Sequence, residues 1–272
     1  TRRMDFLIAP AHARLSVKDF LLHHLPGFSL IHLRRAVRDG HCTLDGQPLL
    51  NWGLRLQPGQ HLILNIDPAA PNARRPEALP LHILYEDADL LALHKPPGQL
   101  VHPTLKVKTG TLANALSHHL AGQRFWFPHR LDQLTSGVLL VAKTPTALRT
   151  LTRTWPHAVK HYIALLAGQF PHDQLDIHAP IGRDPLASPP WGVREGGKPA
   201  HSRLSVLSRS AHQTRVRLEP LTGRTNQLRI HCAHLGYPIL GDPLYGNPGE
   251  RLFLHAESLT VAGHTFTSPA NF

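Results

Sequence analysis

Apolar and polar residues follow two different periods along the chain, and each period predicts a different kind of element. At residues 17–25 and 30–37 apolar positions recur at helical spacing, and Ser16 and Ser29 precede these runs where N-caps are expected. An Asp-Gly pair between two short β-type runs then signals a hairpin. Residues 14–66 are therefore predicted to form a small α+β module.

The rest of the chain mixes short strands with a few helices. Apolar runs predict strands at 81–85, 90–95, 161–167, 202–208 and 213–219, and helical spacing predicts helices at 111–121, 145–155 and 226–235. Because strands and helices do not alternate regularly, the fold class is α+β, with a mixed, largely antiparallel sheet flanked by helices and loops. Residues 67–79 are rich in Pro and Ala and predict a linker, which leaves 80–272 as the larger domain.

The chain carries a strong positive charge. Its 272 residues include 29 Lys and Arg against 18 Asp and Glu, a formal net charge of +11. Such an excess favours a polyanionic partner, either nucleic acid or an anionic membrane surface. No apolar run approaches membrane-spanning length, so neither a transmembrane segment nor a membrane partner is expected.

Cysteine and histidine contents bear on the compartment and on metal chemistry. With Cys42 and Cys232 as the only cysteines, a disulfide framework is not expected and the cytoplasm is the predicted compartment. Histidine pairs occur at 23–24 and 118–119, and a third group at 231–234. None of them forms a Cys/His zinc pattern with a distant second half, so no bound metal is predicted.

Three arginines lie off the apolar stripe of the second predicted helix, namely Arg34, Arg35 and Arg38. Such residues most often form a solvated helix face. Residues 1–66, however, contain eight Lys and Arg against four Asp and Glu, a net charge of +4. Together with the charge of the whole chain, this favours contact with phosphates.

Asp132 lies between a basic residue and a polar turn, directly before an apolar run. Arg130 precedes it, and Thr135-Ser136-Gly137 leads into the β-type residues 138–142. A carboxylate at the edge of a core, beside an arginine, is typical of a functional site. A turn cap, or an ion pair with Arg130, explains the same residues about equally well.

Two other segments carry side chains that could join Asp132 in one cleft. Tyr162 alternates with apolar neighbours on a predicted strand, and Arg229 lies one turn into a helix that Thr225 can cap. A carboxylate, a phenol and a guanidinium could supply a nucleophile, a general base or stacking surface, and a counter-charge. Taken singly, Tyr162 is better explained as a core aromatic and Arg229 as a surface ion-pair partner, and spacing alone does not show that the three meet.

Taken in order, these segments resemble the RluA/RluD family of RNA pseudouridine synthases. His129-Arg130-Leu131-Asp132 with Thr135-Ser136-Gly137 is similar to the family's catalytic HRLD-x-x-[ST]-[ST]-G segment, and Lys160-His161-Tyr162 to its K-x-Y segment. Further matches are GRTNQLR at 223–229, AHLG at 233–236, GDPLYG at 241–246, KPPG at 95–98 and LFLHA at 252–256. Residues 14–66 resemble the ribosomal-protein-S-four-type RNA-binding module that many of these enzymes carry.

The resemblance implies an enzyme that isomerises uridine to pseudouridine in RNA, with Asp132 as its catalytic aspartate. It also implies that Tyr162 stacks on the flipped uracil and is a candidate general base, and that Arg229 pairs with Asp132. Arg130 would fill the gap left by the extracted nucleotide, and His129 and Arg224 are expected to contact RNA. No cofactor or metal is implied, because the reaction is redox-neutral and consumes nothing.

The N-terminal module favours large-subunit (23S) ribosomal RNA as the substrate, because relatives without it include tRNA-modifying enzymes. A tRNA pseudouridine synthase is one alternative, and a non-catalytic RNA-binding or ribosome-assembly factor on the same scaffold is another. Gln133-Leu134 replaces the family's usual charged pair, and Asn226 replaces its usual His. Both departures bear on the target site more than on the activity. A monomer is expected.

Overall fold

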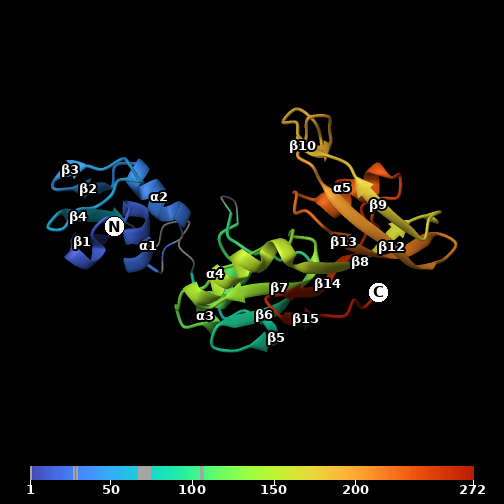
Figure 1. Ribbon diagram of the computed structural model, residues 1–272, viewed down its shortest axis with the longest axis horizontal. Helices are drawn as coiled ribbons and strands as arrows, with labels where there is room; N and C mark the ends of the chain where they lie inside the picture. Colours follow the sequence, from blue (N-terminus) through green and yellow to red (C-terminus); the bar gives the residue numbers. More distant parts are fainter. Residues whose placement is uncertain (1, 27, 29, 67–74, 105–106) are drawn as a thin grey trace. The chain divides into compact units, whose positions relative to one another are not determined.

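The computed structural model describes residues 2–26, 28, 30–66, 75–104 and 107–272, which fall into two compact units. The first unit comprises residues 1–80 together with 102–124, and the second comprises 81–101 together with 125–272. Figure 1 labels the elements of both.

The first unit contains a four-stranded antiparallel sheet with the spatial order β1-β4-β2-β3. Its strands are β1 Arg2–Leu7, β2 Cys42–Leu44, β3 Gln47–Pro48 and β4 His61–Ile66. Its helical elements are the 3-10 turn Pro10–His12, α1 Val17–His24, α2 Leu30–Arg38 and α3 Leu112–His119. Apolar residues of α1, α2, β2 and β4 form one buried core.

Local sequence explains where these elements begin and turn. The Ser16 hydroxyl accepts a hydrogen bond from the Asp19 amide at 3.1 Å, so α1 is capped as predicted. The Asp-Gly pair between β2 and β3 has positive φ angles of 50° and 79°, which a tight hairpin turn requires. The other predicted cap, Ser29, and residues 67–74 of the predicted linker lie outside the described residues. β1 pairs with β4, so the small sheet also includes residues before 14.

The second unit is built on a nine-stranded sheet with the order β5-β6-β7-β14-β8-β13-β12-β9, and β15 pairs with β14. The strands are β5 His82–Glu86, β6 Leu90–Lys95, β7 Ser136–Ala142, β8 Val159–Ala167, β9 Gln174–His178, β12 His201–Arg209, β13 Gln213–Pro220, β14 Leu254–Val261 and β15 His264–Thr267. Every pairing described is antiparallel except that of β7 with β14. The prediction of an α+β fold with a mixed, largely antiparallel sheet is confirmed.

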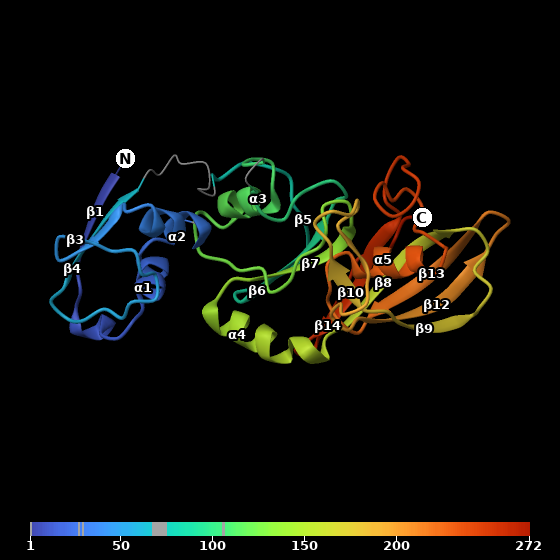
Figure 2. The same ribbon diagram turned by 90° about the horizontal axis from the view of Figure 1, so that it is seen from above.

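Two helices pack on this sheet, and a small hairpin packs against one of them. α4 Pro145–Thr154 packs against β7 and is followed by a 3-10 turn, Trp155–His157, as Figure 2 shows from above. α5 Gln227–His234 packs against β12 and β13, next to the hairpin of β10 Ile181–Arg183 and β11 Trp191–Val193. All seven residues of β7 are buried, as the apolar run after Asp132 predicted.

The second residue of β7 is a glycine, Gly137, for a steric reason. Its φ is 115°, and a Cβ there would collide with the backbone carbonyl of Ala256 in β14. Only glycine permits this close approach. The Thr135-Ser136-Gly137 turn therefore brings the loop that carries Asp132 directly against β14.

One detail of the predicted helices is wrong. α5 has Asn226, not Thr225, at its N-cap position, and no side chain caps it there. Asn226 adopts a left-handed conformation with a φ of 52°, which asparagine tolerates better than most residues. The helix therefore begins at Gln227, after a sharper turn than a Thr cap would give.

Candidate active site

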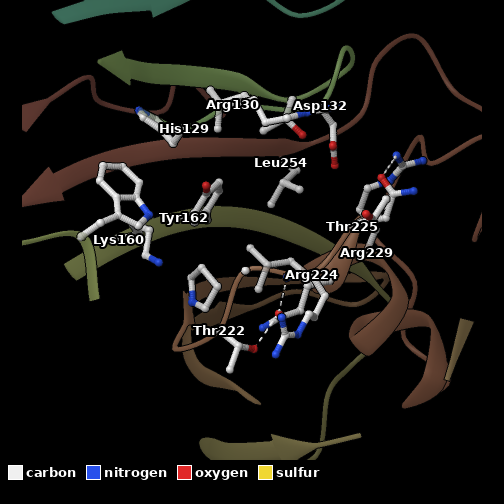
Figure 3. A pocket seen from close by; sticks show the side chains of 18 of the residues that line it. His129, Arg130, Asp132, Lys160, Tyr162, Thr222, Arg224, Thr225, Arg229 and Leu254 are labelled. Atoms are coloured by element: carbon white, nitrogen blue, oxygen red, sulfur yellow. Dashed lines mark hydrogen bonds between the residues drawn. The ribbon is translucent and has the colours of Figure 1, made fainter. Parts of the chain in front are cut away.

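A cavity of about 390 Å³ opens in the second unit, among the loop before β7, strand β8 and the segment that leads into α5 (Figure 3). The sequence-predicted residues that line it are His129, Arg130, Asp132, Tyr162, Arg224 and Arg229. The structure thus brings the three separated segments together. The spacing of these segments in the sequence did not show that they meet. Asp132 is the one carboxylate among the described residues that line the cavity.

The loop that carries Asp132 is held in place by Lys95, at the end of β6. Lys95 is 0% exposed, and its ammonium donates hydrogen bonds to the carbonyls of Pro96, Gln99 and Gln133 at 2.8–2.9 Å. The Gln133 carbonyl also accepts from the Gly98 amide at 2.9 Å. These bonds fix the residue directly after Asp132, so the carboxylate has a rigid support.

Burial also changes the pKa of the Lys95 ammonium. It lowers the pKa of Lys95 to about 8, against the opposing effect of the negative charge of Asp132. Lys95 therefore stays largely protonated at neutral pH, and it places a buried positive charge close to the carboxylate. The sequence contained this residue in the KPPG segment at 95–98, but gave no sign of its three carbonyl partners, since one of them is 38 positions away.

Ionisation of Asp132 carries a free-energy cost. Burial raises the pKa of its carboxyl group above the usual range, and the positive charges of Arg229, Arg130 and Lys95 only partly offset that effect. Among the described residues its carboxylate forms no salt bridge and accepts no hydrogen bond, although its backbone carbonyl accepts from the Thr135 amide at 3.1 Å. The carboxylate is thus free to interact with a molecule in the cavity.

Arg229 does not form the expected ion pair with Asp132. Its guanidinium makes a two-pronged salt bridge to Asp242, with Nε–Oδ2 at 2.7 Å and Nη2–Oδ1 at 2.6 Å. Asp242 is fully buried and also accepts hydrogen bonds from the amides of Leu244 and Tyr245. It therefore holds Arg229 more firmly than a carboxylate without such support could. The charge of Arg229 still acts on Asp132 and lowers its pKa.

The Arg229–Asp242 pair is strongly ionised on both sides. Burial lowers the pKa of Arg229, but the hydrogen bond and charge of Asp242 outweigh this and raise it overall. Burial raises the pKa of Asp242, but the hydrogen bonds from Arg229 and the Leu244 amide bring it below the usual range. The sequence contained Asp242 in the GDPLYG segment at 241–246. An acidic residue between Gly and Pro was the signal that could have identified Asp242 as a functional residue.

Asn226 completes the surroundings of Arg229. Its side-chain oxygen accepts from Arg229 Nη1 at 3.2 Å, and its side-chain nitrogen donates to the Tyr245 hydroxyl at 3.2 Å. The Arg229 guanidinium also lies over the Tyr245 ring, 5.2 Å from its centroid. Asn226, which replaces the family's usual His, therefore supplies a side chain that orients Arg229.

Tyr162 projects from β8 into the cavity between the Asp132 loop and the Arg224 segment (Figure 3). Burial raises the pKa of its phenol well above the usual range, and the negative charge of Asp132 raises it further. The phenol is therefore un-ionised at neutral pH. Its ring is a ready surface for stacking, whereas a role as a general base requires the hydroxyl proton to leave during the reaction.

His129 supports the loop as well as lining the cavity. Its Nε2 accepts a hydrogen bond from the Leu140 amide at 2.9 Å, and its ring stacks on Trp155 with centroids 4.7 Å apart. Burial, together with the positive charge of Lys160, lowers its pKa to about 3, so the ring is neutral. Contact of His129 with RNA remains a prediction, and a neutral ring makes it a stacking or hydrogen-bonding contact.

Basic side chains line the cavity on both sides. Arg130 is exposed, Lys160 lies near His129, and Arg224 is anchored by a hydrogen bond from its Nε to the Pro199 carbonyl at 3.0 Å. Figure 3 shows Asp132 and Arg229 at one side of the cavity and His129 and Lys160 at the other. A negatively charged backbone passing over a single carboxylate suits this distribution of charge.

Three predicted RNA-binding residues lie in the other unit, on the exposed side of α2. Arg35 and Arg38 pair with Asp39 at 3.2 and 2.8 Å, and Arg34 has no ion-pair partner among the described residues. Exposed pairs of this kind are weak and can exchange for phosphate. Phosphate contact by these arginines remains a prediction.

Comparison with known proteins identifies the family. Residues 89–234 match the model of the RNA pseudouridylate synthase family. An Aquifex aeolicus protein described as an uncharacterized RNA pseudouridine synthase is 34% identical over 278 residues, which cover 96% of this chain and 87% of the relative. The chain belongs to the RNA pseudouridylate synthase family. It is an RNA pseudouridine synthase, an isomerase, as the resemblance implied.

Other relatives of this synthase agree. The ribosomal large subunit pseudouridine synthase D of Pseudomonas aeruginosa is 35% identical over 227 residues, covering 81% of this chain and 70% of the relative. The structure of human RNA pseudouridylate synthase domain containing 1 superimposes with a TM-score of 0.63 at 30% identity, covering 72% of this chain and 86% of that one. Within the described residues, no helix combines the length and apolar character needed to span a membrane.

Proposed function

We propose that this synthase converts specific uridines to pseudouridine in large-subunit ribosomal RNA, with Asp132 as its catalytic aspartate. The observation that carries the proposal is the position of Asp132, the one carboxylate among the described lining residues of a cavity surrounded by basic side chains. Relatives named for the ribosomal large subunit, at 35% and 41% identity, support the choice of RNA. Residues 14–66 are proposed to act as an S-four-like RNA-binding module, 67–79 as a linker and 80–272 as the catalytic domain.

The chemistry follows from a carboxylate facing a flipped nucleotide. Isomerisation breaks the bond between N1 of uracil and C1′ of ribose, turns the base and forms a bond from C5 to C1′, while C5 loses a proton and N1 gains one. Positive charge develops on the sugar as the first bond breaks. The Asp132 carboxylate could stabilise that charge, attack the sugar or the base covalently, or assist deprotonation of the ribose.

Entry of a base requires its extraction from the RNA fold. Tyr162 is proposed to stack on the flipped uracil, and Arg130 to fill the space that the nucleotide leaves. The buried Arg229–Asp242 pair keeps a positive charge near Asp132 without neutralising it by direct contact. The positive charge of Arg229 favours the ionised form of Asp132, and the carboxylate stays available to the ribose.

Mapping of pseudouridine tests the substrate. In cells that lack this protein we expect a uridine in large-subunit ribosomal RNA to remain unmodified, while the pseudouridines of transfer RNA are unchanged. Wild-type protein supplied from a plasmid should restore the site, and the Asp132→Asn variant should not. Loss of a transfer-RNA pseudouridine with intact ribosomal RNA would establish the tRNA alternative instead.

The acid limb of the pH–rate profile should report Asp132. Because burial raises the pKa of this carboxyl group, activity should fall, as the pH is lowered, at a higher pH than a solvent-exposed aspartate would give. Single-turnover rates on labelled RNA, measured from neutral to acidic pH, would check this. A rate that stays constant down to the ordinary range of an exposed aspartate would contradict the raised pKa.

Tyr162 variants should separate the ring from the hydroxyl. Tyr162→Leu removes the stacking surface and should weaken RNA binding about tenfold or more, since stacking on an aromatic ring contributes about 1–3 kcal/mol per base. Tyr162→Phe keeps the ring and should leave the KM within about twofold. A loss of kcat in the Phe variant at unchanged KM would measure the part that the hydroxyl plays in proton transfer. Equal KM values in the Leu variant and wild type would rule out stacking.

A further inference from the structure

Three histidines of the first unit converge outside the catalytic cavity. His12 ends the 3-10 turn before α1, and His23 and His24 occupy the last turn of α1. The ring centroids of His12 and His24 are 4.7 Å apart, and those of His23 and His24 are 4.8 Å apart. The sequence showed only the His23-His24 pair, because His12 reaches it through the fold.

We propose that His12, His23 and His24 bind one divalent transition-metal ion. Their candidate ligand nitrogens all lie within 4.8 Å of one another. A zinc–nitrogen bond of about 2.0–2.1 Å places two nitrogens on one ion roughly 3–4 Å apart. Since His23 is exposed and its ring can rotate, a small change of its rotamer closes the set.

The His24 ring is oriented as a metal ligand would be. Its Nδ1 lies 3.0 Å from the Phe20 carbonyl, which makes Nδ1 the protonated nitrogen and leaves the Nε2 lone pair available. Histidine ligands usually donate their second ring N–H to a carbonyl or carboxylate, and this bond fixes the tautomer and the direction of the lone pair. Stacking of His24 on Phe20, with centroids 4.1 Å apart, further restricts the ring.

His12 supplies an independent observation. Its Nδ1 is buried and has no hydrogen-bond partner among the residues that the structure describes. A buried polar atom without a partner destabilises a fold by about 1–3 kcal/mol, so such atoms are uncommon unless something else satisfies them. A coordinated ion would satisfy this nitrogen, and the T-shaped contact of the His12 ring with Phe20 restricts the ring.

The chemistry of the three donors selects the class of ion. Neutral imidazoles suit Zn²⁺, Co²⁺, Ni²⁺ and Cu²⁺, whereas Mg²⁺ and Ca²⁺ require oxygen ligands. Three protein ligands leave at least one coordination position for water. Because the ion would join the turn before α1 to the last turn of that helix, it would stabilise the folded first unit, and this stabilisation would grow with the logarithm of the ion concentration once that exceeds the Kd.

The test is a titration of the tag-free full-length protein with Zn²⁺ and with Co²⁺, in wild type, His23→Gln, His12→Gln and His118→Gln. His118 is the matched control, because it belongs to an exposed His-His pair in the last turn of another eight-residue helix, α3, outside the cluster. We expect one tight site per chain in wild type and in His118→Gln. Its affinity should fall at least about tenfold in His23→Gln and in His12→Gln.

Two readouts keep the result independent of folding. The melting temperature in EDTA should be the same for His23→Gln and wild type, since His23 is exposed, while added Zn²⁺ should raise it only in wild type and in the control. Nitrogen-15 spectra of the histidine rings should show Zn²⁺ shifting three rings first, and the His24 signal should identify Nε2 as the bound nitrogen. Equal titrations in wild type and His23→Gln, or several weak sites without one tight site, would overturn the proposal.

Discussion

Replacing Asp132 with asparagine is expected to lower the rate of isomerisation by at least about a thousandfold, as measured by tritium release from RNA labelled at C5 of uracil. Asparagine has nearly the same shape but no negative charge, so it can neither stabilise positive charge on the sugar nor act as a nucleophile. The turn should survive, because the local bond to the Thr135 amide uses the backbone carbonyl of residue 132. Tritium release at the wild-type rate would rule out Asp132 as the catalytic residue.

The same variant should be at least as stable as wild type at neutral pH. An acid whose pKa is raised by folding binds protons more tightly in the folded state, so ionisation of Asp132 destabilises the fold as the pH rises past its ordinary range. Asparagine does not ionise, and its advantage in melting temperature should disappear at acidic pH. A lower melting temperature at pH 7 would show that the carboxylate stabilises the fold.

Asp87→Asn is a control in which the stability at neutral pH should change in the opposite direction. Asp87 belongs to the same unit, but the Tyr85 hydroxyl and the amides of Asp89 and Leu90 donate to its carboxylate and lower its pKa. Its charge therefore stabilises the fold at neutral pH, and this stabilisation is lost as the pH falls through the lowered pKa. The control should lose stability at neutral pH and keep activity.

Replacing Asp242 with alanine is expected to destabilise the protein by about 3–5 kcal/mol, because it leaves the Arg229 charge buried without a partner. It also removes the two hydrogen bonds that position the Arg229 guanidinium, so activity should fall as well. Urea unfolding of wild type and of this variant, with tritium release from the folded fraction, would measure the two effects. A loss of less than about 1 kcal/mol would show that Arg229 finds another partner.

The double variant Arg229→Met with Asp242→Leu separates stability from catalysis. Removing both charges removes the cost of an unpaired buried ion, so much of the lost stability should return. Activity should not return, since no positive charge then remains at that position to favour the ionised form of Asp132. Recovery of activity would show that Arg229 acts only through packing.

Local patterns predicted most elements of the fold because their causes are local. The cap at Ser16, the hairpin turn and the buried run of β7 depend on neighbouring residues, and all three are present. Thr225 was a wrong cap because a left-handed Asn226 lies between it and the helix. The Asn226 side chain is bonded to Arg229, three positions later, and to Tyr245, 19 positions later, and the second of these contacts is not visible in the local sequence.

The site was harder to predict than the fold because its contacts join distant residues. Family motifs brought Asp132, Tyr162 and Arg229 together correctly, but motif order does not state which carboxylate an arginine touches. Asp242 lies 13 positions after Arg229, on a turn with no regular structure, so no periodicity connects them. The three carbonyls around Lys95 depend on loop geometry in the same way.

The position of β14 in the sheet has a consequence for synthesis on the ribosome. β14 lies between β7 and β8, so the strand that follows the Asp132 loop and the strand that carries Tyr162 are joined through residues 254–261 (Figure 1). These residues leave the ribosome after both of the strands that they join. A nascent chain can thus form each half of the sheet in turn, but Asp132 and Tyr162 face one cavity only after residues 254–261 have been added between β7 and β8. Fragments that end before residue 254 should therefore be inactive.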